Sequence, residues 1–168
     1  MPDRSGRACF VLTRRAGSLR SHAGQWALPG GRIDPDETAI EAARRETAEE
    51  VGLSSDAADV LATLDDYPTR SGYVITPVVL WCDPAADLTP NEGEVASIHL
   101  IPLAELDHPE APRLITIRES SNPVIQMPLM GQWIHAPTAA ILLQLRDVAL
   151  HGRASRVAHL DQPTWAWR

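Results

Sequence analysis

Three glutamates, Glu46, Glu49 and Glu50, are spaced to lie on one face of a single helix. Carboxylates at these spacings repel one another, and Arg45 is the one neighbour placed to offset them, mainly at Glu49. Clustered carboxylate oxygens are the ligands that Mg²⁺ and Mn²⁺ prefer, and these ions commonly share substrate phosphates as further ligands. The cluster therefore indicates either a metal-dependent phosphoryl-transfer site or a solvated acidic face.

The sequence around the glutamates predicts the helix that would carry them. Helix-forming residues run from 38 to 51, Thr38 and Glu41 form a capping-box pattern, and Gly52 stands where a left-handed C-terminal cap is expected. The preceding Pro29-Gly30-Gly31 turn allows a backbone carbonyl to come close to the glutamates. The residues expected to face a sheet are Ile40, Ala43, Thr47 and Val51.

The segment from Gly31 to Leu53 resembles the complete Nudix box. Thr47 stands where that family usually has an aliphatic residue, which changes packing more than chemistry. The resemblance implies an α/β (α+β) fold, an α/β/α sandwich around a central mixed sheet. It also implies hydrolysis of a nucleoside diphosphate linked to another moiety. The residues that match the box are Gly31, Glu37, Arg45, Glu46, Glu49, Glu50 and Gly52.

The same resemblance implies roles for individual residues. Arg45 would orient a glutamate by a charge-assisted hydrogen bond, with Glu37 and Gly52 as supporting residues. The metal would neutralise the pyrophosphate and acidify a bound water, and a carboxylate would accept the proton of that water. Which glutamate acts as this base stays open. The implied ligands of Mg²⁺ or Mn²⁺ are Glu46, Glu49, Glu50 and the carbonyl oxygen of Gly31.

Segments on both sides of the box are similar to the coenzyme A pyrophosphatase branch of the Nudix family. These segments are Leu12-Thr13-Arg14-Arg15, 19–25, 28–31, 71–79 and 90–95. Leu28 stands where the branch has phenylalanine, and Ala16-Gly17 where it usually has serine and alanine. The similarity implies cleavage of coenzyme A or acyl-coenzyme A into 3′,5′-ADP and 4′-phosphopantetheine. The alternatives are hydrolysis of ADP-ribose, NADH or dinucleoside polyphosphates, and a nucleotide-binding module without catalysis.

Several residues before the helix are candidates for contact with the substrate. Arg14, Arg15 and Arg20 could bind the 3′-phosphate of coenzyme A, since arginine binds phosphate bidentately, or could form an exposed basic strand end. Gly30 is expected at the substrate. Gln25 could either hydrogen-bond the substrate or fix its own loop.

Nudix enzymes often draw one acidic residue from a loop outside the box, so the resemblance implies that Glu94 joins the site as a further ligand or as the general base. The alternative is an ordinary turn residue, and Glu92 lies two positions away. Trp26, Tyr73 and Trp81 are candidates for stacking on an adenine, or alternatively for the core.

The 168-residue chain carries 15 basic and 22 acidic residues, for a net charge of −7. More than half of this charge lies in the Nudix-like segment 31–53, where seven acids face three arginines. Nucleic acid and anionic membranes need a positive field, so we expect neither as a partner, and a small nucleotide-type pyrophosphate as the substrate. Two cysteines are too few for a disulfide framework, and the most apolar stretch, 74–81, is too short to span a bilayer, so a cytoplasmic protein is expected.

We expect one Nudix domain over residues 1–168. The expected strands are 7–15, 60–67, 73–82, 96–103, 113–118 and 124–130, followed at the end of the chain by an irregular tail. A second helix is expected at about 138–151, after Pro137 and before Gly152. This helix should pack on the sheet, and its apolar run could also serve a homodimer interface.

Overall fold

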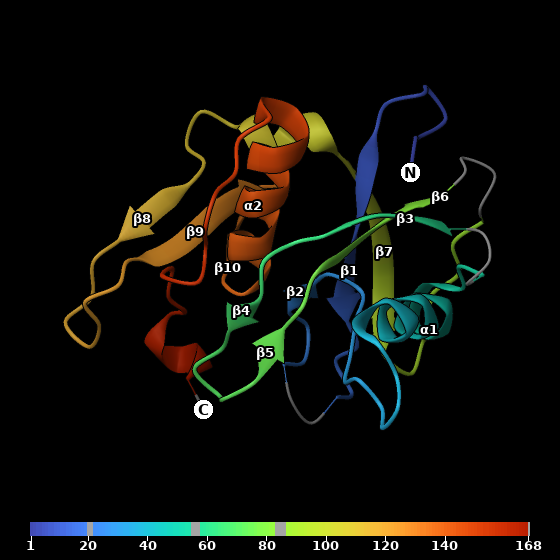
Figure 1. Cartoon of the computed structure of the whole chain (residues 1–168), viewed down its shortest axis with the longest axis horizontal. Coiled ribbons are helices and arrows are strands. Elements are labelled where there is room, and N and C mark those ends of the chain that lie inside the picture. Colours follow the sequence, from blue (N-terminus) through green and yellow to red (C-terminus); the bar gives the residue numbers. More distant parts are fainter. Residues whose placement is uncertain (20–21, 55–57, 83–86, 168) are drawn as a thin grey trace. The chain divides into compact units, whose positions relative to one another are not determined.

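The chain forms two compact units in the computed structural model, which describes residues 1–19, 22–54, 58–82 and 87–167 (Figure 1). The first unit comprises Met1–Ala62 and Val78–Pro102, and the second comprises Thr63–Pro77 and Leu103–Arg168. Within the described ranges, no helix has the length and apolar character needed to cross a membrane. The expectation of one domain over the whole chain stays a prediction.

The first unit contains a three-stranded antiparallel sheet in the order β2-β1-β7. Its strands are β1 (Cys9–Arg15), β2 (Trp26–Ala27) and β7 (Val95–Pro102), so the strands expected at 7–15 and 96–103 are confirmed. The register shifts near the end of β1, where Arg14 lies opposite Ser97 but Arg15 lies opposite Val95. Such a bulge increases the local twist and often lies next to an active site.

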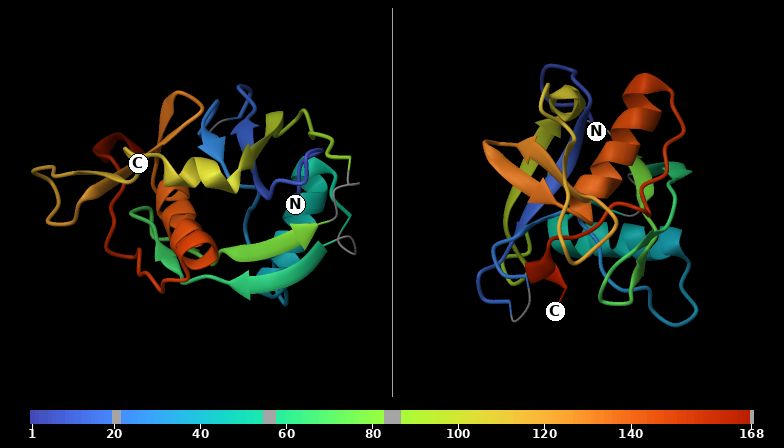
Figure 2. Two further views of the ribbon diagram at one scale, coloured as in Figure 1. Left: turned by 90° about the horizontal axis from the view of Figure 1, so that it is seen from above. Right: turned by 90° about the vertical axis from the view of Figure 1, so that its left-hand side faces the viewer.

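The first unit also contains β6 (Val78–Cys82) and all but the last residue of β3 (Ala58–Thr63), two paired strands that lie side by side in Figure 2. The helix α1 (Ala39–Val51) contacts β6 and β7. Burial of apolar side chains between these elements is the main favourable contribution to their packing. The buried cluster of this unit consists of Met1, Val51, Leu53, Ala58 and Cys82.

Both ends of α1 are capped as the sequence predicts. The Thr38 hydroxyl accepts a hydrogen bond from the Glu41 N–H at 3.2 Å, and the Glu41 carboxylate accepts one from the Thr38 N–H at 2.8 Å. Gly52 closes the helix in the left-handed conformation, with φ 73°. The predicted capping box and C-terminal cap are therefore confirmed.

The buried face of α1 differs in part from the expected one. Val51 is fully buried, as expected, whereas Ile40, Ala43 and Thr47 are only half-buried. Glu50, a predicted ligand, is buried instead. Burial of a charged carboxylate is unfavourable unless opposite charge or hydrogen bonds compensate it, so the groups around Glu50 determine how readily it ionises.

The second unit contains a three-stranded antiparallel sheet in the order β10-β9-β8, together with α2 (Figure 1). Helix α2 packs against β9, β10 and η2, and the expected second helix and its packing on a sheet are confirmed. Its role in a homodimer stays a prediction. The elements of this unit are β4 (Tyr67–Pro68), β5 (Val74–Ile75), the 3₁₀ helix η2 (Leu103–Asp107), β8 (Arg113–Ile115), β9 (Val124–Leu129), β10 (Gln132–His135), α2 (Thr138–His151) and the 3₁₀ helix η3 (Thr164–Ala166).

Several strands are shorter than expected. The expected strand 73–82 is divided into β5 and β6 at Pro77, which has no N–H to donate to a sheet. The expected strand 60–67 likewise ends at Thr63, and Tyr67 belongs to the separate strand β4. The strands expected at 113–118 and 124–130 end at Ile115 and Leu129.

Two strands, β2 and β10, are absent from the sequence-based expectation. With two residues, β2 is too short to give a pattern. Strand β10 follows β9 through Met130 and Gly131, whose φ angles of 52° and 71° have the signs that a type I′ hairpin turn requires. Methionine carries no turn signal at such a position, so the hairpin is not evident from the sequence.

Arg70, between β4 and β5, binds the C-terminal tail within the second unit. Its guanidinium donates to both carboxylate oxygens of Asp161, with Nε to Oδ1 at 2.9 Å, and to the hydroxyl of Ser120 at 2.9 Å. Its Cζ lies 4.6 Å from the centroid of the Trp167 ring. Asp161 is buried, and its hydrogen bonds with Arg70 lower the pKa of its carboxyl to about 2.

We expect Asp161→Asn to lower the free energy of unfolding at pH 7 by about 1–3 kcal/mol, because hydrogen bonds to a charged group are lost. The lowered pKa means that this stabilisation is complete above the ordinary pKa of 3.8 and is lost as the pH falls through about 2. Urea unfolding at pH 7 and at pH 2 measures the difference. The exposed Asp59→Asn is the matched control, and an equal loss from Asp161→Asn at both pH values would contradict a charge-based role.

Candidate active site

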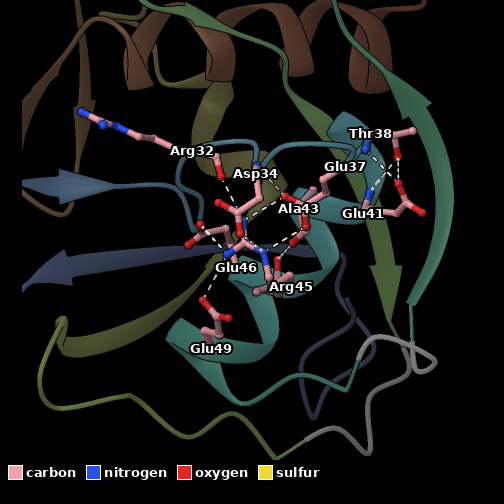
Figure 3. Close-up of polar contacts among 10 residues, drawn as sticks. Arg32, Asp34, Glu37, Thr38, Glu41, Ala43, Arg45, Glu46 and Glu49 are labelled. Atoms are coloured by element: carbon pink, nitrogen blue, oxygen red, sulfur yellow. Dashed lines mark hydrogen bonds and ion pairs between the residues drawn. The ribbon is translucent and has the colours of Figure 1, made fainter.

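Arg45 lies at the centre of a carboxylate network in the first unit (Figure 3). Its Nε and Nη2 donate to the two carboxylate oxygens of Glu37 at 2.9 and 3.1 Å. Its Nη1 donates to Glu46 at 2.8 Å and to Glu49 at 3.2 Å, and Nη2 also donates to the Arg32 carbonyl at 2.9 Å. One guanidinium therefore joins the loop before α1 to two glutamates of α1 itself. Arg45 contacts Glu49 as expected, but its hydrogen bonds with Glu37 and Glu46 are shorter, so the expectation that it acts mainly on Glu49 is wrong.

Glu37 is fixed by this network from the loop side. Besides its paired bonds with Arg45, its carboxylate accepts a hydrogen bond from the Asp34 N–H at 3.0 Å. Hydrogen bonds with Arg45, and then with Asp34, lower the pKa of Glu37. Glu37 is therefore a charged anchor that orients Arg45, and this geometry agrees with a supporting role.

Gly31 lies directly against the Glu46 carboxylate. A Cβ atom at Gly31 would lie 2.2 Å from Glu46 Oε1 and 2.6 Å from Oε2, closer than side-chain contacts allow. The preceding Gly30 has φ 153°, a conformation that favours glycine. The two glycines thus allow the backbone to pass next to the glutamates of α1, as the sequence predicts.

Glu50 is the buried member of the glutamate cluster, with 4% of its surface exposed. Its Oε2 accepts a hydrogen bond from the Gly30 N–H at 3.2 Å, and its Oε1 lies 3.9 Å from Nη1 of Arg15. Burial raises the pKa of its carboxyl from 4.5 to about 7, and the negative charges of Glu46 and Glu94 add to this rise. The Gly30 N–H and the Arg15 charge act in the opposite direction and only partly compensate.

The loop before β7 brings Glu94 to the same region. At the C-terminal end of α1, the carbonyls of Glu50 and Val51 accept hydrogen bonds from the N–H groups of Asn91 and Thr89, at 3.0 and 2.9 Å. The Asn91 carbonyl in turn accepts from the Glu94 N–H at 2.9 Å. This loop therefore satisfies carbonyls that a helix end leaves unpaired, and it anchors Glu94 near Glu50.

The predicted substrate arginines do not form one cluster. Arg14 and Arg15 are consecutive residues of β1, so their side chains leave opposite faces of the strand. Arg15 lies near Glu50, whereas the Cζ of Arg14 lies 5.6 Å from the centroid of the Trp26 ring. Arg20 lies outside the described residues. A joint contact of Arg14 and Arg15 with one phosphate is therefore not favoured by this geometry.

The remaining candidates from the sequence lie in different places. The Oε1 atom of Gln25 lies 3.1 Å from Nδ1 of His22 in the same loop, which favours the loop-fixing alternative for Gln25. Trp81 is on β6 with 37% of its surface exposed. Tyr73, with 53% exposed, belongs to the second unit and precedes β5.

Comparison with known proteins shows the family to which the chain belongs. Residues 2–120 match the family model described as the NUDIX domain. The chain belongs to the Nudix family. The match includes α1, the Gly30-Gly31 turn and Glu94.

Curated relatives of this Nudix chain carry the name "uncharacterized Nudix hydrolase NudL". The protein of Photorhabdus laumondii is 45% identical over 97 residues, which cover 57% of this chain and 52% of the relative. The protein of Escherichia coli strain K12 is 41% identical over 100 residues, which cover 59% of this chain and 52% of the relative. The chain spans about half the length of these curated relatives.

Two solved structures have a similar fold. The Nudix hydrolase RenU of M. smegmatis aligns with a TM-score of 0.62 at 23% identity, over 92% of this chain and 83% of that one. The C. elegans Ap4A hydrolase, solved as a binary complex, aligns with a TM-score of 0.56 at 18% identity, over 89% of this chain and 92% of that one. At these identities the likeness shows the fold alone. The expected Nudix-type α/β fold is confirmed.

The donor chemistry of the Nudix glutamates fits a hard divalent cation. Burial, and then the negative charges of Glu46 and Glu94, raise the pKa of Glu50, because the Gly30 N–H and Arg15 compensate its charge only in part. Within the part of the chain that the structure describes, no three His, Cys, Asp or Glu side chains already converge as a metal-binding group. Glu46 and Glu49 instead accept hydrogen bonds from Arg45. The ligand roles of Glu46, Glu49, Glu50, Glu94 and the Gly31 carbonyl stay predictions.

Gly31→Ala tests the close contact with Glu46. The added Cβ would push the Glu46 carboxylate away from Arg45, and loss of this charge-assisted hydrogen bond should lower the free energy of unfolding by about 1–2 kcal/mol. Gly17→Ala is the matched control, because a Cβ at Gly17 meets nothing within 4 Å and should be neutral or stabilising by up to about 1 kcal/mol. Urea unfolding of both variants and of wild type measures these changes in the free energy of unfolding. Equal stability of Gly31→Ala and Gly17→Ala would contradict the contact.

Glu50→Gln should raise stability in metal-free buffer at pH 8 by about 2–3 kcal/mol. A folded-state pKa of about 7, above the ordinary 4.5, means that the folded protein loses stability as the pH rises from 4.5 through 7. Glutamine has no charge to desolvate and still offers an oxygen to the Gly30 N–H. The difference between variant and wild type should vanish at pH 4. Urea unfolding in the presence of a chelator measures this difference in stability. If Glu50→Gln were less stable than wild type at pH 8, the prediction would be contradicted, because the charge of Glu50 would then be compensated.

Proposed function

We propose that this Nudix chain is a Mg²⁺- or Mn²⁺-dependent pyrophosphohydrolase that cleaves coenzyme A or acyl-coenzyme A into 3′,5′-ADP and 4′-phosphopantetheine. The observation that carries the proposal is the buried carboxylate of Glu50, which lies 3.9 Å from Arg15 and within electrostatic range of Glu46 and Glu94. Membership in the Nudix family and the hydrolase names of its relatives support the hydrolytic reaction. The segments that resemble the coenzyme A branch support the substrate.

The glutamates of α1 are the groups that would hold the cation in this proposal. Glu46, Glu49 and Glu50 supply carboxylate oxygens from one helix, and Gly31, whose carbonyl oxygen is the further predicted ligand, lies against Glu46. When bound, the cation supplies positive charge against the pyrophosphate and acidifies a water. Arg45 holds Glu46 and Glu49 in place through its hydrogen bonds, and so limits the movement that ligand binding requires.

Two further residues act on the substrate in this proposal. Arg15 offers its guanidinium to the pyrophosphate, because its contact with Glu50 at 3.9 Å is longer than a hydrogen bond. Glu94 accepts the proton of the attacking water. Its carboxylate is exposed and accepts no hydrogen bond from any other residue in the described ranges, whereas Glu37 and Glu46 are held by Arg45. A positioned carboxylate of this kind contributes as a general base.

A substrate panel tests the proposed reaction. The protein is incubated with coenzyme A, acetyl-coenzyme A, ADP-ribose, NADH or diadenosine tetraphosphate, in Mg²⁺ or Mn²⁺, and products are identified by mass. We expect metal-dependent cleavage of the two coenzyme A compounds and loss of turnover with a chelator. Robust turnover of ADP-ribose with none of coenzyme A would refute the substrate assignment, and nucleotide binding without any turnover would favour a binding module.

The paired variants Glu94→Gln and Glu92→Gln test the proposed base in the same assay. Glu94→Gln should lower kcat on the order of 10²–10⁴-fold, as expected for removal of a general base. Glu92→Gln changes an exposed acid of the same loop and should leave kcat within about twofold of wild type. Equal activity of the two variants would refute the assignment of Glu94.

A further inference from the structure

The loop before β7 turns at Asn91, and both the backbone and the side chain of this residue take part in the turn. The Asn91 carbonyl accepts hydrogen bonds from the N–H groups of Glu94 at 2.9 Å and of Val95 at 2.8 Å. Its side-chain Oδ1 accepts a further hydrogen bond from the Gly93 N–H at 3.2 Å. A side-chain oxygen that binds the N–H two residues further along the chain forms an Asx turn. Asn91 therefore closes the turn that ends at Glu94.

Both ends of this turn are held by other elements of the first unit. The Asn91 N–H donates a hydrogen bond to the backbone carbonyl of Glu50, near the end of α1, at 3.0 Å. The Glu94 carbonyl accepts a hydrogen bond at 2.8 Å from the N–H of Ala16, which directly follows β1. The turn therefore connects the helix that carries Glu50 to the strand end that carries Arg15.

The tip of the turn, directly before Glu94, depends on the Asn91 side chain. The Gly93 N–H makes no hydrogen bond to any other group in the described ranges. Glycine loses more conformational freedom than any other residue when it is ordered, so this bond restrains the residue that most needs it. A Cβ at Gly93 would lie 3.3 Å from Asn91 Oδ1, and glycine therefore leaves room for the close approach of this acceptor.

We propose that Asn91 is a positioning residue for Glu94, whose carboxylate its side chain holds in place by closing the turn. This inference rests on the proposed function, in which Glu94 is the general base. A general base must lie within hydrogen-bond reach of the proton that it accepts, and a small displacement from this geometry lowers the rate. The Glu94 side chain is exposed and accepts no hydrogen bond in the described ranges, so its direction depends on the backbone that carries it.

Three variants of the loop test this role with the substrate of the panel that the protein cleaves. Asn91→Leu keeps the size of the side chain but removes the acceptor, and kcat should fall by about 3- to 10-fold, the factor that corresponds to loss of one neutral hydrogen bond. KM and the Mg²⁺ concentration for half-maximal activity should stay within about twofold, since the base acts on the chemical step. Asn91→Asp retains the acceptor and should stay within about twofold of the wild-type kcat. Glu92→Gln is the matched control, an exposed side chain of the same turn.

A double-mutant cycle shows whether Asn91 acts through Glu94. In a Glu94→Gln protein the base is already absent, so Asn91→Leu should lower kcat by less than about twofold, against about 3- to 10-fold in the wild-type background. An equal loss in both backgrounds would overturn the proposal, because Asn91 would then act on the fold or on other groups. A wild-type kcat for Asn91→Leu, or a loss that Asn91→Asp does not restore, would also overturn it.

Nuclear spin relaxation of the backbone amides separates this inference from the proposed function, because it needs no turnover. The order parameters of Gly93 and Glu94 should be about 0.85 in wild type and in Asn91→Asp, and below about 0.6 in Asn91→Leu. This pattern in a protein that cleaves no substrate of the panel would refute the reaction and support the positioning of Glu94. Unchanged order parameters in Asn91→Leu would overturn the positioning role even in an active enzyme. Thermal unfolding shows whether Asn91→Leu is folded; if it is not, Asn91→Ala takes its place in each measurement.

Discussion

The burial of one carboxylate, that of Glu50, is the constraint on which the site in the first unit depends. An isolated buried charge is unfavourable, and the groups that compensate it here are few: one N–H from Gly30 and one arginine, Arg15, at 3.9 Å. Glu46 and Glu94 add negative charge to the same place. A divalent cation would supply the charge that is lacking, and this explains in physical terms why a stable fold retains such a cluster.

The surrounding elements hold this cluster at both ends of α1. At the N-terminal side, Arg45 connects α1 to Glu37 in the preceding loop. At the C-terminal side, the N–H groups of Thr89 and Asn91 donate hydrogen bonds to the last carbonyls of the helix. The Asn91 carbonyl accepts a hydrogen bond from the Glu94 N–H, which holds Glu94 near the same helix end. The scaffold of the site therefore consists of hydrogen bonds and close backbone approaches, and the glutamates proposed to bind metal take part in it through Arg45 and the Gly30 N–H.

Much of this scaffold can be predicted from the sequence, because it is local. The capping box of α1, the cap at Gly52 and the pairing of Arg45 with Glu49 all follow from spacings of three to four residues. The burial of Glu50 cannot be predicted in this way, because it depends on strands and loops far along the chain. The contact of Arg70 with Asp161 joins residues 91 positions apart and has no local signal. The hairpin turn at Met130 cannot be predicted for a different reason, because methionine rarely adopts the positive φ that this position of the turn requires.

The coupling between the Glu50 charge and a bound cation can be measured as proton release. Titration with Mg²⁺ at pH 7 in two buffers of different ionisation enthalpy gives the number of protons released per bound ion. With a pKa of about 7, Glu50 is about half protonated before binding, so we expect release of about half a proton per chain, and none from Glu50→Gln. Binding of Mg²⁺ without proton release, or equal release from both proteins, would contradict the role of Glu50 as the buried group that the cation neutralises.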